Sequence, residues 1–297
     1  RQINLATLQS LYNLLFKQKD LELIEQIVST NIVCADEVHV FSAPTYFKVM
    51  SNINAAYRWG FSATALNDSL YHNYHVVAAT GPIIHHLPAI DLIQQQKLAE
   101  PYILFVKFNS PKYYSEADNY TQVHLDCIVN CYPRNNIIKE IVEYFLKQNI
   151  RFVVLVRRIE HGEILSQLTN LDFVHGGLPN STRQQMFEKL RNNQIPGFIA
   201  STILDEGINI ENIQALIIAA GGKSYIKTIQ RVGRALRYCP DKPYVLLIDF
   251  LDNHNNITYR HSVRRLNIYR KYKFNTEVVD YAHLYRRIEE LYKTKNT

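Results

Sequence analysis

Short, uninterrupted apolar runs recur along this chain, and most are followed at once by a polar residue. Stretches with helical periodicity separate them, as from about Ile137 to Leu146. Continuous apolar strands that alternate with helices predict parallel sheets covered on both faces. We therefore expect an α/β fold in which ligands bind just beyond the carboxyl ends of the strands. The candidate strands are 32–35, 102–106, 152–156, 198–200, 215–219 and 244–248.

A change of pattern near Leu87-Pro88 predicts a domain boundary. Residues 1–87 contain one partial α/β unit, residues 88–252 contain a complete one, and residues 253–297 have the pattern of a basic helical tail. The polar segment 109–120 is expected to be a loop or hairpin. A chain of 297 residues is long enough for two compact domains.

Several classes of protein are disfavoured by composition. The chain has no run of about 18 or more apolar residues, so we expect no membrane span, and its first residues do not resemble a secretory leader. The chain begins Arg1-Gln2 without an initiator Met, so we expect that it was cut from a longer protein. No second cysteine pair accompanies Cys127 and Cys131, which favours reduced thiols in the cytoplasm over a zinc site or disulfides.

The net charge is +6, with an isoelectric point near 9.0, which is a weak indication of a polyanionic partner. The segment from Tyr259 to Lys273 is dense in Arg and Lys, with aromatic side chains between them. That segment could follow a nucleic-acid backbone or could be a solvated helix face. Four histidines lack an acid or cysteine at ligand spacing and are expected in a surface loop: His72, His75, His85 and His86.

The first candidate site is Asp36-Glu37-Val38-His39, which directly follows an apolar strand. One carboxylate at such a position can hold Mg²⁺, usually through water, and its neighbour can polarise an attacking water. The four residues alone are also compatible with a solvated turn.

Three further groups of residues are each weak evidence by themselves. Gly60–Thr64 and Ser201–Asn209 lie at expected strand ends, and Val174–Gly177 precedes a helix expected from about Ser181 to Leu190. Small hydroxyl and acidic groups at these places could contact a ligand, although an ordinary strand-to-turn cap has the same composition.

Gln230, Arg234 and Arg237 fall at i, i+4 and i+7, so on a helix they share one face. Two guanidiniums and an amide on one face suit the γ-phosphate of a nucleotide. A solvated surface helix is the alternative, but Gly233 inside it would cost about 1 kcal/mol relative to Ala without a packing reason.

In order and spacing, these groups resemble the motor core of superfamily 2 helicases of the DEAD/DEAH-box kind, in the branch with phage helicases of the UvsW type and XPB-like repair helicases. The resemblance covers nearly the whole chain. It implies two RecA-like domains, of which the first is incomplete here, with ATP and Mg²⁺ as cofactors and nucleic acid as the partner, DNA favoured over RNA. A phage-encoded protein of this kind would act in the host cytoplasm.

The resemblance also implies a role for each matching residue. Asp36 would hold Mg²⁺, and the catalytic set would be Asp36, Glu37, His39, Gln230, Arg234 and Arg237. The residues that couple ATP to movement would be Ser62, Thr64, Gly207 and Asn209. The nucleic-acid contacts would be Thr7, Gln9, Arg157, His175, Gly176, Thr202, Arg264 and Arg265.

Two departures from the family pattern matter. Asn209 stands where the family usually has Asp, which weakens the expected contact there. The Gly-rich phosphate loop that the family carries before Ala6-Thr7 is absent from the stretch. Gly221-Gly222-Lys223-Ser224 does not replace it, because the phosphate-loop pattern requires Gly where Ile217 stands. We expect a strand-to-helix turn there.

The expected function is therefore an ATP-dependent helicase or translocase that acts on DNA in unwinding, branch migration or repair, here as a fragment. The alternative is a non-catalytic nucleic-acid-binding subunit that works with another ATPase. A restriction-complex motor would need a nuclease, and we find no acid-and-lysine nuclease pattern.

The first prediction is that residues 1–297 alone bind nucleic acid weakly and do not hydrolyse ATP, because the phosphate loop is absent from this stretch. A malachite-green phosphate assay with DNA present measures the turnover. Robust phosphate release would contradict the expectation that this stretch lacks a group needed to hold the ATP phosphates.

Overall fold

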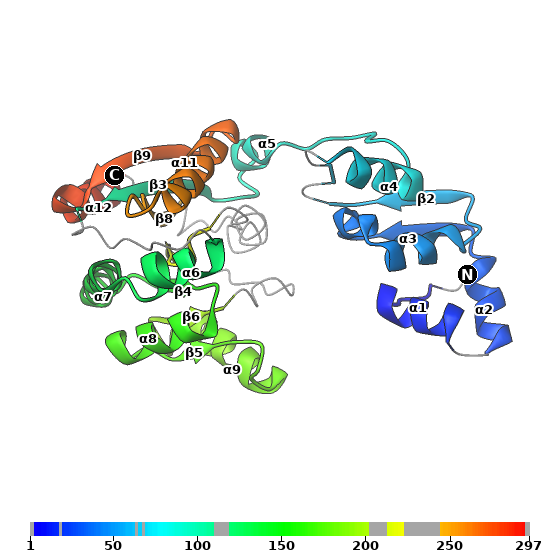
Figure 1. Ribbon diagram of the computed structural model, residues 1–297, viewed down its shortest axis with the longest axis horizontal. Helices are drawn as coiled ribbons and strands as arrows, with labels where there is room; N and C mark the ends of the chain where they lie inside the picture. Colours follow the sequence, from blue (N-terminus) through cyan, green and yellow to red (C-terminus); the bar gives the residue numbers. More distant parts are fainter. Residues whose placement is uncertain are drawn as a thin grey trace. The chain divides into compact units, whose positions relative to one another are not determined.

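The computed structural model describes residues 3–17, 20–62, 65–66, 69–109, 119–201, 213–222 and 244–294. The chain divides into two compact units, Arg1–His86 and Leu87–Thr297, which are coloured from blue to red along the sequence in Figure 1. No helix in these ranges is long and apolar enough to cross a membrane.

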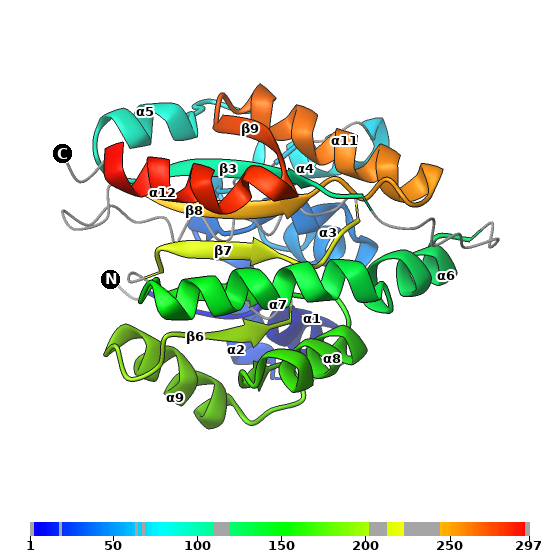
Figure 2. The same cartoon turned by 90° about the vertical axis from the view of Figure 1, so that its left-hand side faces the viewer.

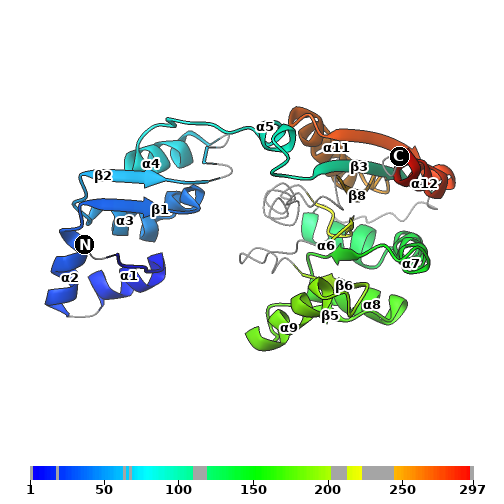
Figure 3. The same cartoon turned by 180° about the vertical axis from the view of Figure 1, so that it is seen from behind.

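The first unit contains a pair of parallel strands. Ile32 of β1 lies opposite Tyr57 of β2, and Ala35 lies opposite Gly60, so the carboxyl ends of the two strands are neighbours (Figure 3). The elements are α1 (Leu8–Phe16), α2 (Leu21–Val28), β1 (Ile32–Ala35), the 3-10 helix η1 (Val38–Ser42), α3 (Pro44–Ser51), β2 (Tyr57–Gly60) and α4 (Leu70–Thr80).

Three helices of this unit begin at a polar side chain that accepts a hydrogen bond from the first turn. These side chains belong to Thr7, Asp20 and Ser69. The core beneath is formed by η1, α3 and α4 and includes Val38, Phe41 and Val49. His72 and His75 lie on α4 rather than in the expected loop, because Ser69 caps a helix that includes them. No group of three potential ligands that could hold a metal occurs in the described part of the chain.

The second unit is built on a seven-stranded sheet in the order β5-β6-β4-β7-β8-β3-β9, and every neighbouring pair is parallel. This confirms the expected α/β class. The strands are β3 (Glu100–Lys107), β4 (Phe152–Leu155), β5 (Phe173–Val174), β6 (Gly197–Ala200), β7 (Ala215–Ile218), β8 (Tyr244–Phe250) and β9 (Asn275–Asp280).

Helices cover both faces of the sheet, as the continuous apolar strands predict. Apolar residues of α9 and α11 pack on one face. Those of α7, α8 and α12 pack on the other, which faces the viewer in Figure 2. The helical elements are α5 (Ala89–Gln94), α6 (Tyr120–His124), the π-helical turn η2 (Leu125–Val129), α7 (Tyr132–Lys147), α8 (Ile159–Thr169), α9 (Asn180–Arg191), α11 (Asn256–Lys271), η4 (Tyr281–His283) and α12 (Leu284–Thr294).

The segment 253–297, expected as a basic helical tail, is not purely helical. Between α11 and α12 it contains β9, which pairs with β3 from Tyr102–Asn275 to Lys107–Asp280. Its last helix buries Leu284, Ile288 and Leu291 in the core of the sheet. Three polar residues, Asn275, Thr276 and Glu277, begin this strand, so no apolar run marks it in the sequence.

Gly197 begins β6 where the chain passes close to a neighbouring strand. A Cβ atom at this position would lie 2.6 Å from the backbone oxygen of Phe152 and 2.9 Å from its ring. Both strands are fully buried at this point, so the backbone cannot move away without disturbing the sheet.

We therefore predict that Gly197→Ala lowers the free energy of unfolding by about 1–3 kcal/mol through overpacking. The urea midpoint followed by far-ultraviolet circular dichroism measures the change. Gly177→Ala is the matched control, because its added methyl group meets only the His175 side chain, at 3.1 Å. Equal midpoints for the two variants would contradict the packing argument.

Candidate nucleotide and nucleic-acid site

Two carboxylates lie immediately beyond the carboxyl end of β1. The backbone nitrogen of Glu37 donates to the Asp36 Oδ1 atom at 2.8 Å, which fixes the first carboxylate beside the strand. Glu37 has a φ angle of 52°, in the left-handed region that few residues other than glycine adopt. Such strain is concentrated at functional sites. The Glu37 side chain is 41% exposed and therefore accessible to a ligand.

His39 connects this acidic turn to the end of the neighbouring strand. Its Nδ1 atom lies 3.1 Å from the Glu37 Oε2 atom and 3.1 Å from the Ser62 hydroxyl oxygen, two residues beyond β2. Gly60, the last residue of β2, permits this approach, because a Cβ atom there would lie 2.9 Å from side chains of Val38 and Thr80. The structure thus brings together Asp36, Glu37, His39 and Ser62.

The remaining candidates of the first unit lie on or beside its first helix. Thr7 is exposed and caps α1, accepting a hydrogen bond from the Ser10 nitrogen at 3.1 Å. Gln9 is exposed on the same helix. Thr64 lies outside the described residues. Contact of Thr7 and Gln9 with nucleic acid stays a prediction.

In the second unit, Arg157, Ser201 and His175 follow β4, β6 and β5, three adjacent strands of the sheet. They are therefore arranged along one carboxyl edge. Thr202 follows Ser201 but is outside the described part of the chain. So are five other candidates: Gly207, Asn209, Gln230, Arg234 and Arg237.

Tyr120 holds the exposed Arg157 and was missed by the sequence interpretation, which placed residue 120 in a loop. The Arg157 Nη1 atom donates to the Tyr120 hydroxyl at 3.2 Å, and its guanidinium lies 5.6 Å from the ring centroid. Desolvation by burial raises the pKa of Tyr120. His175 stacks on Phe173 with ring centroids 5.0 Å apart, and its Nδ1 atom accepts from the Gly177 nitrogen at 3.3 Å. Gly176 is exposed in the turn between them.

The placement of Arg265 does not support its assignment as a nucleic-acid contact. The side chain is only 1% exposed. Its Nε and Nη2 atoms donate to the two carboxylate oxygens of Asp249, each at 3.0 Å, and Nη1 donates to the Gly222 carbonyl at 2.8 Å. The guanidinium is therefore occupied inside the protein. Arg264, the preceding residue on the helix, is exposed and remains a candidate for contact with nucleic acid.

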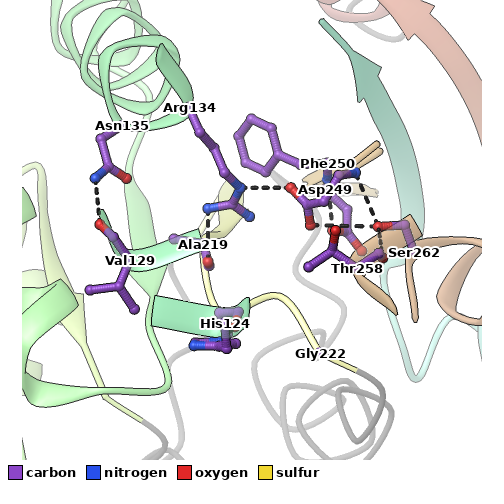
Figure 4. Close-up of polar contacts among 12 residues, drawn as sticks. His124, Val129, Arg134, Asn135, Ala219, Gly222, Asp249, Phe250, Thr258 and Ser262 are labelled. Atoms are coloured by element: carbon purple, nitrogen blue, oxygen red, sulfur yellow. Dashed lines mark hydrogen bonds and ion pairs between the residues drawn. The ribbon is translucent and has the colours of Figure 1, made fainter. Parts of the chain in front are cut away.

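Arg134 is a second buried arginine near the same edge, and the sequence interpretation did not include it. Its Nε atom donates to the Asp252 Oδ1 atom at 2.8 Å, and its Nη1 atom donates to the Ala219 carbonyl at 2.9 Å. Figure 4 shows this side chain reaching from α7 toward the end of β7, with its guanidinium over the Phe250 ring at 4.5 Å. Arg134 lies three, four and seven residues before Ile137, Ile138 and Ile141, and this helical spacing could have indicated that its side chain is buried.

The Gly221-Gly222 pair follows β7 as a tight turn. Gly221 has a φ angle of 57° and Gly222 one of 80°, so both adopt the left-handed conformation that glycine tolerates best. The expectation of a turn is met for the two glycines, whereas Lys223 and Ser224 lie outside the described residues.

Comparison with known proteins adds to this geometry. Residues 134–239 match the family model described as Helicase conserved C-terminal domain. The chain is 23% identical to Putative helicase 22 of Sulfolobus islandicus filamentous virus, over 83% of this chain and 46% of that protein. It is 22% identical to the ATP-dependent DNA helicase uvsW of Enterobacteria phage T4, over 81% of this chain and 52% of that protein.

The crystal structure of T4 UvsW has the same fold, with a TM-score of 0.51 and 19% identity over 91% of this chain and 57% of that one. The parallel sheet, covered by helices on both faces and with polar residues at its carboxyl edge, defines a RecA-like α/β protein. In sequence the chain is therefore similar to superfamily 2 helicases, and UvsW-type helicases are among its relatives. It spans about half the length of these curated relatives.

His124 lies behind the turn and contacts the residue that precedes the glycine pair. Its Nε2 atom donates to the Ala220 carbonyl at 2.9 Å. Desolvation by burial lowers the pKa of His124 from 6.5 to about 4, against the opposing effect of that hydrogen bond. The imidazole is therefore neutral in the folded protein at neutral pH.

Between pH 6.5 and about 4 the unfolded chain binds a proton at residue 124 that the folded protein does not. We predict that stability falls as the pH falls through this window, by up to about 3 kcal/mol from this group. His124→Gln should make the dependence of the urea midpoint on pH shallower. His283→Gln, which alters an exposed imidazole, is the control, and an equal flattening in both variants would refute the prediction.

Proposed function

We propose that the complete protein is an ATP-dependent nucleic-acid translocase or helicase that acts on DNA in preference to RNA. The observation that carries this proposal is the hydrogen-bonded set at the ends of β1 and β2, in which His39 lies between Glu37 and Ser62. Binding of nucleic acid alone requires no such arrangement of carboxylates. The name of uvsW, an ATP-dependent DNA helicase, supports the choice of DNA.

The acidic turn offers ligands of the type that Mg²⁺ prefers, since carboxylate oxygens are hard donors. In this proposal Asp36 holds the ion through water, and the exposed Glu37 carboxylate polarises the water that attacks the γ-phosphate. His39 fixes the direction of the Glu37 carboxylate. His39 also contacts Ser62. A movement of the turn at Asp36-Glu37 is therefore transmitted to the end of β2 through the His39 side chain.

The second unit would supply both phosphate-stabilising groups and nucleic-acid contacts. Gln230, Arg234 and Arg237 are proposed to stabilise charge on the γ-phosphate, with Gly207 and Asn209 coupling that event to movement. The exposed Arg157, pinned to Tyr120, offers a guanidinium to a nucleic-acid phosphate. Such contacts are independent of sequence and weaken as salt rises.

Further proposed contacts with nucleic acid come from His175, Gly176, Thr202 and Arg264, together with Thr7 and Gln9 in the first unit. We place the activity in the cytoplasm, or in the host cytoplasm if the gene belongs to a phage.

We predict that Glu37→Gln in the complete protein abolishes DNA-stimulated ATP hydrolysis, with a fall in its rate on the order of 100-fold or more. The amide keeps the shape of the side chain but cannot accept a proton from water. ATP binding should persist, because the metal-holding Asp36 is unchanged. Phosphate release and equilibrium binding of a fluorescent ATP analogue measure the two effects.

Glu25→Gln is the matched control, since it neutralises an exposed glutamate on α2, away from the strand ends. Turnover equal to that of the unaltered protein in Glu37→Gln would remove Glu37 from its role. No turnover in the unaltered protein with either DNA or RNA would instead favour a non-catalytic binding subunit.

A further inference from the structure

Arg157, directly beyond β4, carries a charge that no carboxylate of the described part of the chain balances. Its neighbour Arg158 differs, because its guanidinium lies 3.5 Å from the Glu160 carboxylate. The contacts found for Arg157 are with Tyr120: the Nη1 atom donates to the hydroxyl at 3.2 Å, and the guanidinium lies 5.6 Å from the ring centroid. The Arg157 side chain is exposed, so its positive charge is accessible to an anion in solution.

Tyr120 accepts this hydrogen bond as a neutral phenol. Desolvation by burial raises the pKa of Tyr120, and the opposing effect of the Arg157 guanidinium is smaller. The hydroxyl therefore does not neutralise Arg157 at neutral pH. A guanidinium has five N–H donors, and the hydrogen bond found for Arg157 uses one of them. The charge and the direction of the guanidinium are thus set by different groups.

The Tyr120 ring is itself held by two helices of the second unit. The His261 ring of α11 lies edge to face with it, with ring centroids 4.8 Å apart, and the His124 ring of α6 does the same at 5.6 Å. The start of α6 is fixed by Asn119, whose side chain accepts from the Gln122 nitrogen at 2.9 Å. Tyr120 therefore offers Arg157 a fixed partner rather than a mobile one.

Gly222 provides the space in which the Tyr120 hydroxyl and the Arg157 guanidinium meet. A Cβ atom at this position would lie 2.5 Å from the hydroxyl oxygen and 3.4 Å from the Arg157 Nη1 atom. The Gly222 carbonyl accepts from the Nη1 atom of the buried Arg265 at 2.8 Å. The contact between the two side chains therefore rests on backbone that is fixed by a buried guanidinium.

The value of this arrangement lies in the freedom that Arg157 has already lost. A long, exposed arginine has many rotamers, and binding to an anion restricts them at a cost in affinity. In this structure a hydrogen bond and a ring contact restrict Arg157 before any ligand is present. A cation–π contact at an exposed position adds little to the folding free energy, so preparation for a ligand explains the pair better than stability does.

We propose that Tyr120 is a positioning residue for nucleic-acid binding: it holds the Arg157 guanidinium in place for a backbone phosphate. This inference rests on the proposed function, because it assumes that Arg157 contacts nucleic acid. Tyr120 acts through Arg157, so its effect is the same for every base sequence, as expected of a phosphate contact.

The test is a double-mutant cycle in the complete protein with Tyr120→Phe and Arg157→Ala. Tyr120→Phe removes one oxygen atom and keeps the ring, so the fold is retained while the hydrogen bond is lost. The Kd for a fluorescein-labelled single-stranded DNA oligonucleotide, measured by fluorescence anisotropy without ATP, should rise about 2- to 10-fold. In the Arg157→Ala background the same change should leave the Kd unaltered, because two residues that act through one contact are not additive.

The salt dependence of the Kd distinguishes a lost phosphate contact from a weakened one. Loss of one contact lowers the slope of log Kd against log salt concentration by about 0.7 for single-stranded DNA. Arg157→Ala should show this decrease. Tyr120→Phe should keep the slope of the unaltered protein while raising the Kd, since the charge of Arg157 remains.

Tyr292→Phe is the matched control. The Tyr292 ring lies 5.6 Å from that of Tyr244, the first residue of β8, and so at the opposite end of the parallel sheet from Arg157. Its hydroxyl is buried without a hydrogen-bond partner in the described structure. The Kd and the salt slope of this variant should equal those of the unaltered protein. Melting temperatures followed by circular dichroism verify that all the variants are folded.

Each outcome decides between the ideas. If Tyr120→Phe raises the Kd equally in both backgrounds, Tyr120 acts independently of Arg157 and the positioning role is overturned. The role is also overturned if Arg157→Ala raises the Kd and Tyr120→Phe alone does not, although the proposed function then stands. If Arg157→Ala changes neither the Kd nor the salt slope with DNA or RNA, the proposed contact of Arg157 fails first and the inference fails with it.

Discussion

The carboxyl edge of the second unit depends on one buried ion pair. The Asp249 carboxylate accepts two hydrogen bonds from Arg265, one from Tyr269 and one from the Phe250 nitrogen, so its charge is balanced by groups of the protein. Removing the arginine would leave the Asp249 carboxylate buried without its counter-charge, which costs several kcal/mol. The pair joins β8 to α11 and, through the Gly222 carbonyl, to the turn after β7. One guanidinium therefore connects β8 and α11, which are neighbours in sequence, with the turn after β7.

An aspartate that follows an apolar run is found in two different environments in this protein. Asp36 and Asp249 both terminate apolar runs, and from sequence both suggest a ligand site. Asp249 is fully buried and bound by an arginine from a later helix. Asp36 accepts only from the neighbouring backbone among the hydrogen bonds found for it, and Glu37 beside it is exposed. The availability of the carboxylate is decided by tertiary structure, which the local pattern does not contain.

The long buried strands could be predicted because their apolar runs are uninterrupted, and β4, β7 and β8 lie where those runs predict them. Three other described strands were not among the candidates. β5 has two residues, too few for a pattern, β9 begins with three polar residues, and β2 is a four-residue segment with a charged residue inside it. The acidic turn was found from the order of motifs. Its link to Ser62 through His39 was found only once the parallel pairing of β1 and β2 put their ends together.

The helical spacing of the buried arginines indicates their burial, which a count of charges does not. On α11, Ser262, Arg265, Leu266 and Tyr269 fall at i, i+3, i+4 and i+7, and all four are buried. Arg134 begins the same spacing with Ile137, Ile138 and Ile141 on α7. An arginine at a core position of such a stripe must find a buried acid, and strand-end aspartates are the candidates within reach. Arg264, one residue away, lies about 100° around the helix and is exposed. A basic helix is therefore better judged position by position than by its total charge, because one arginine of an adjacent pair can build the fold while the other faces the solvent.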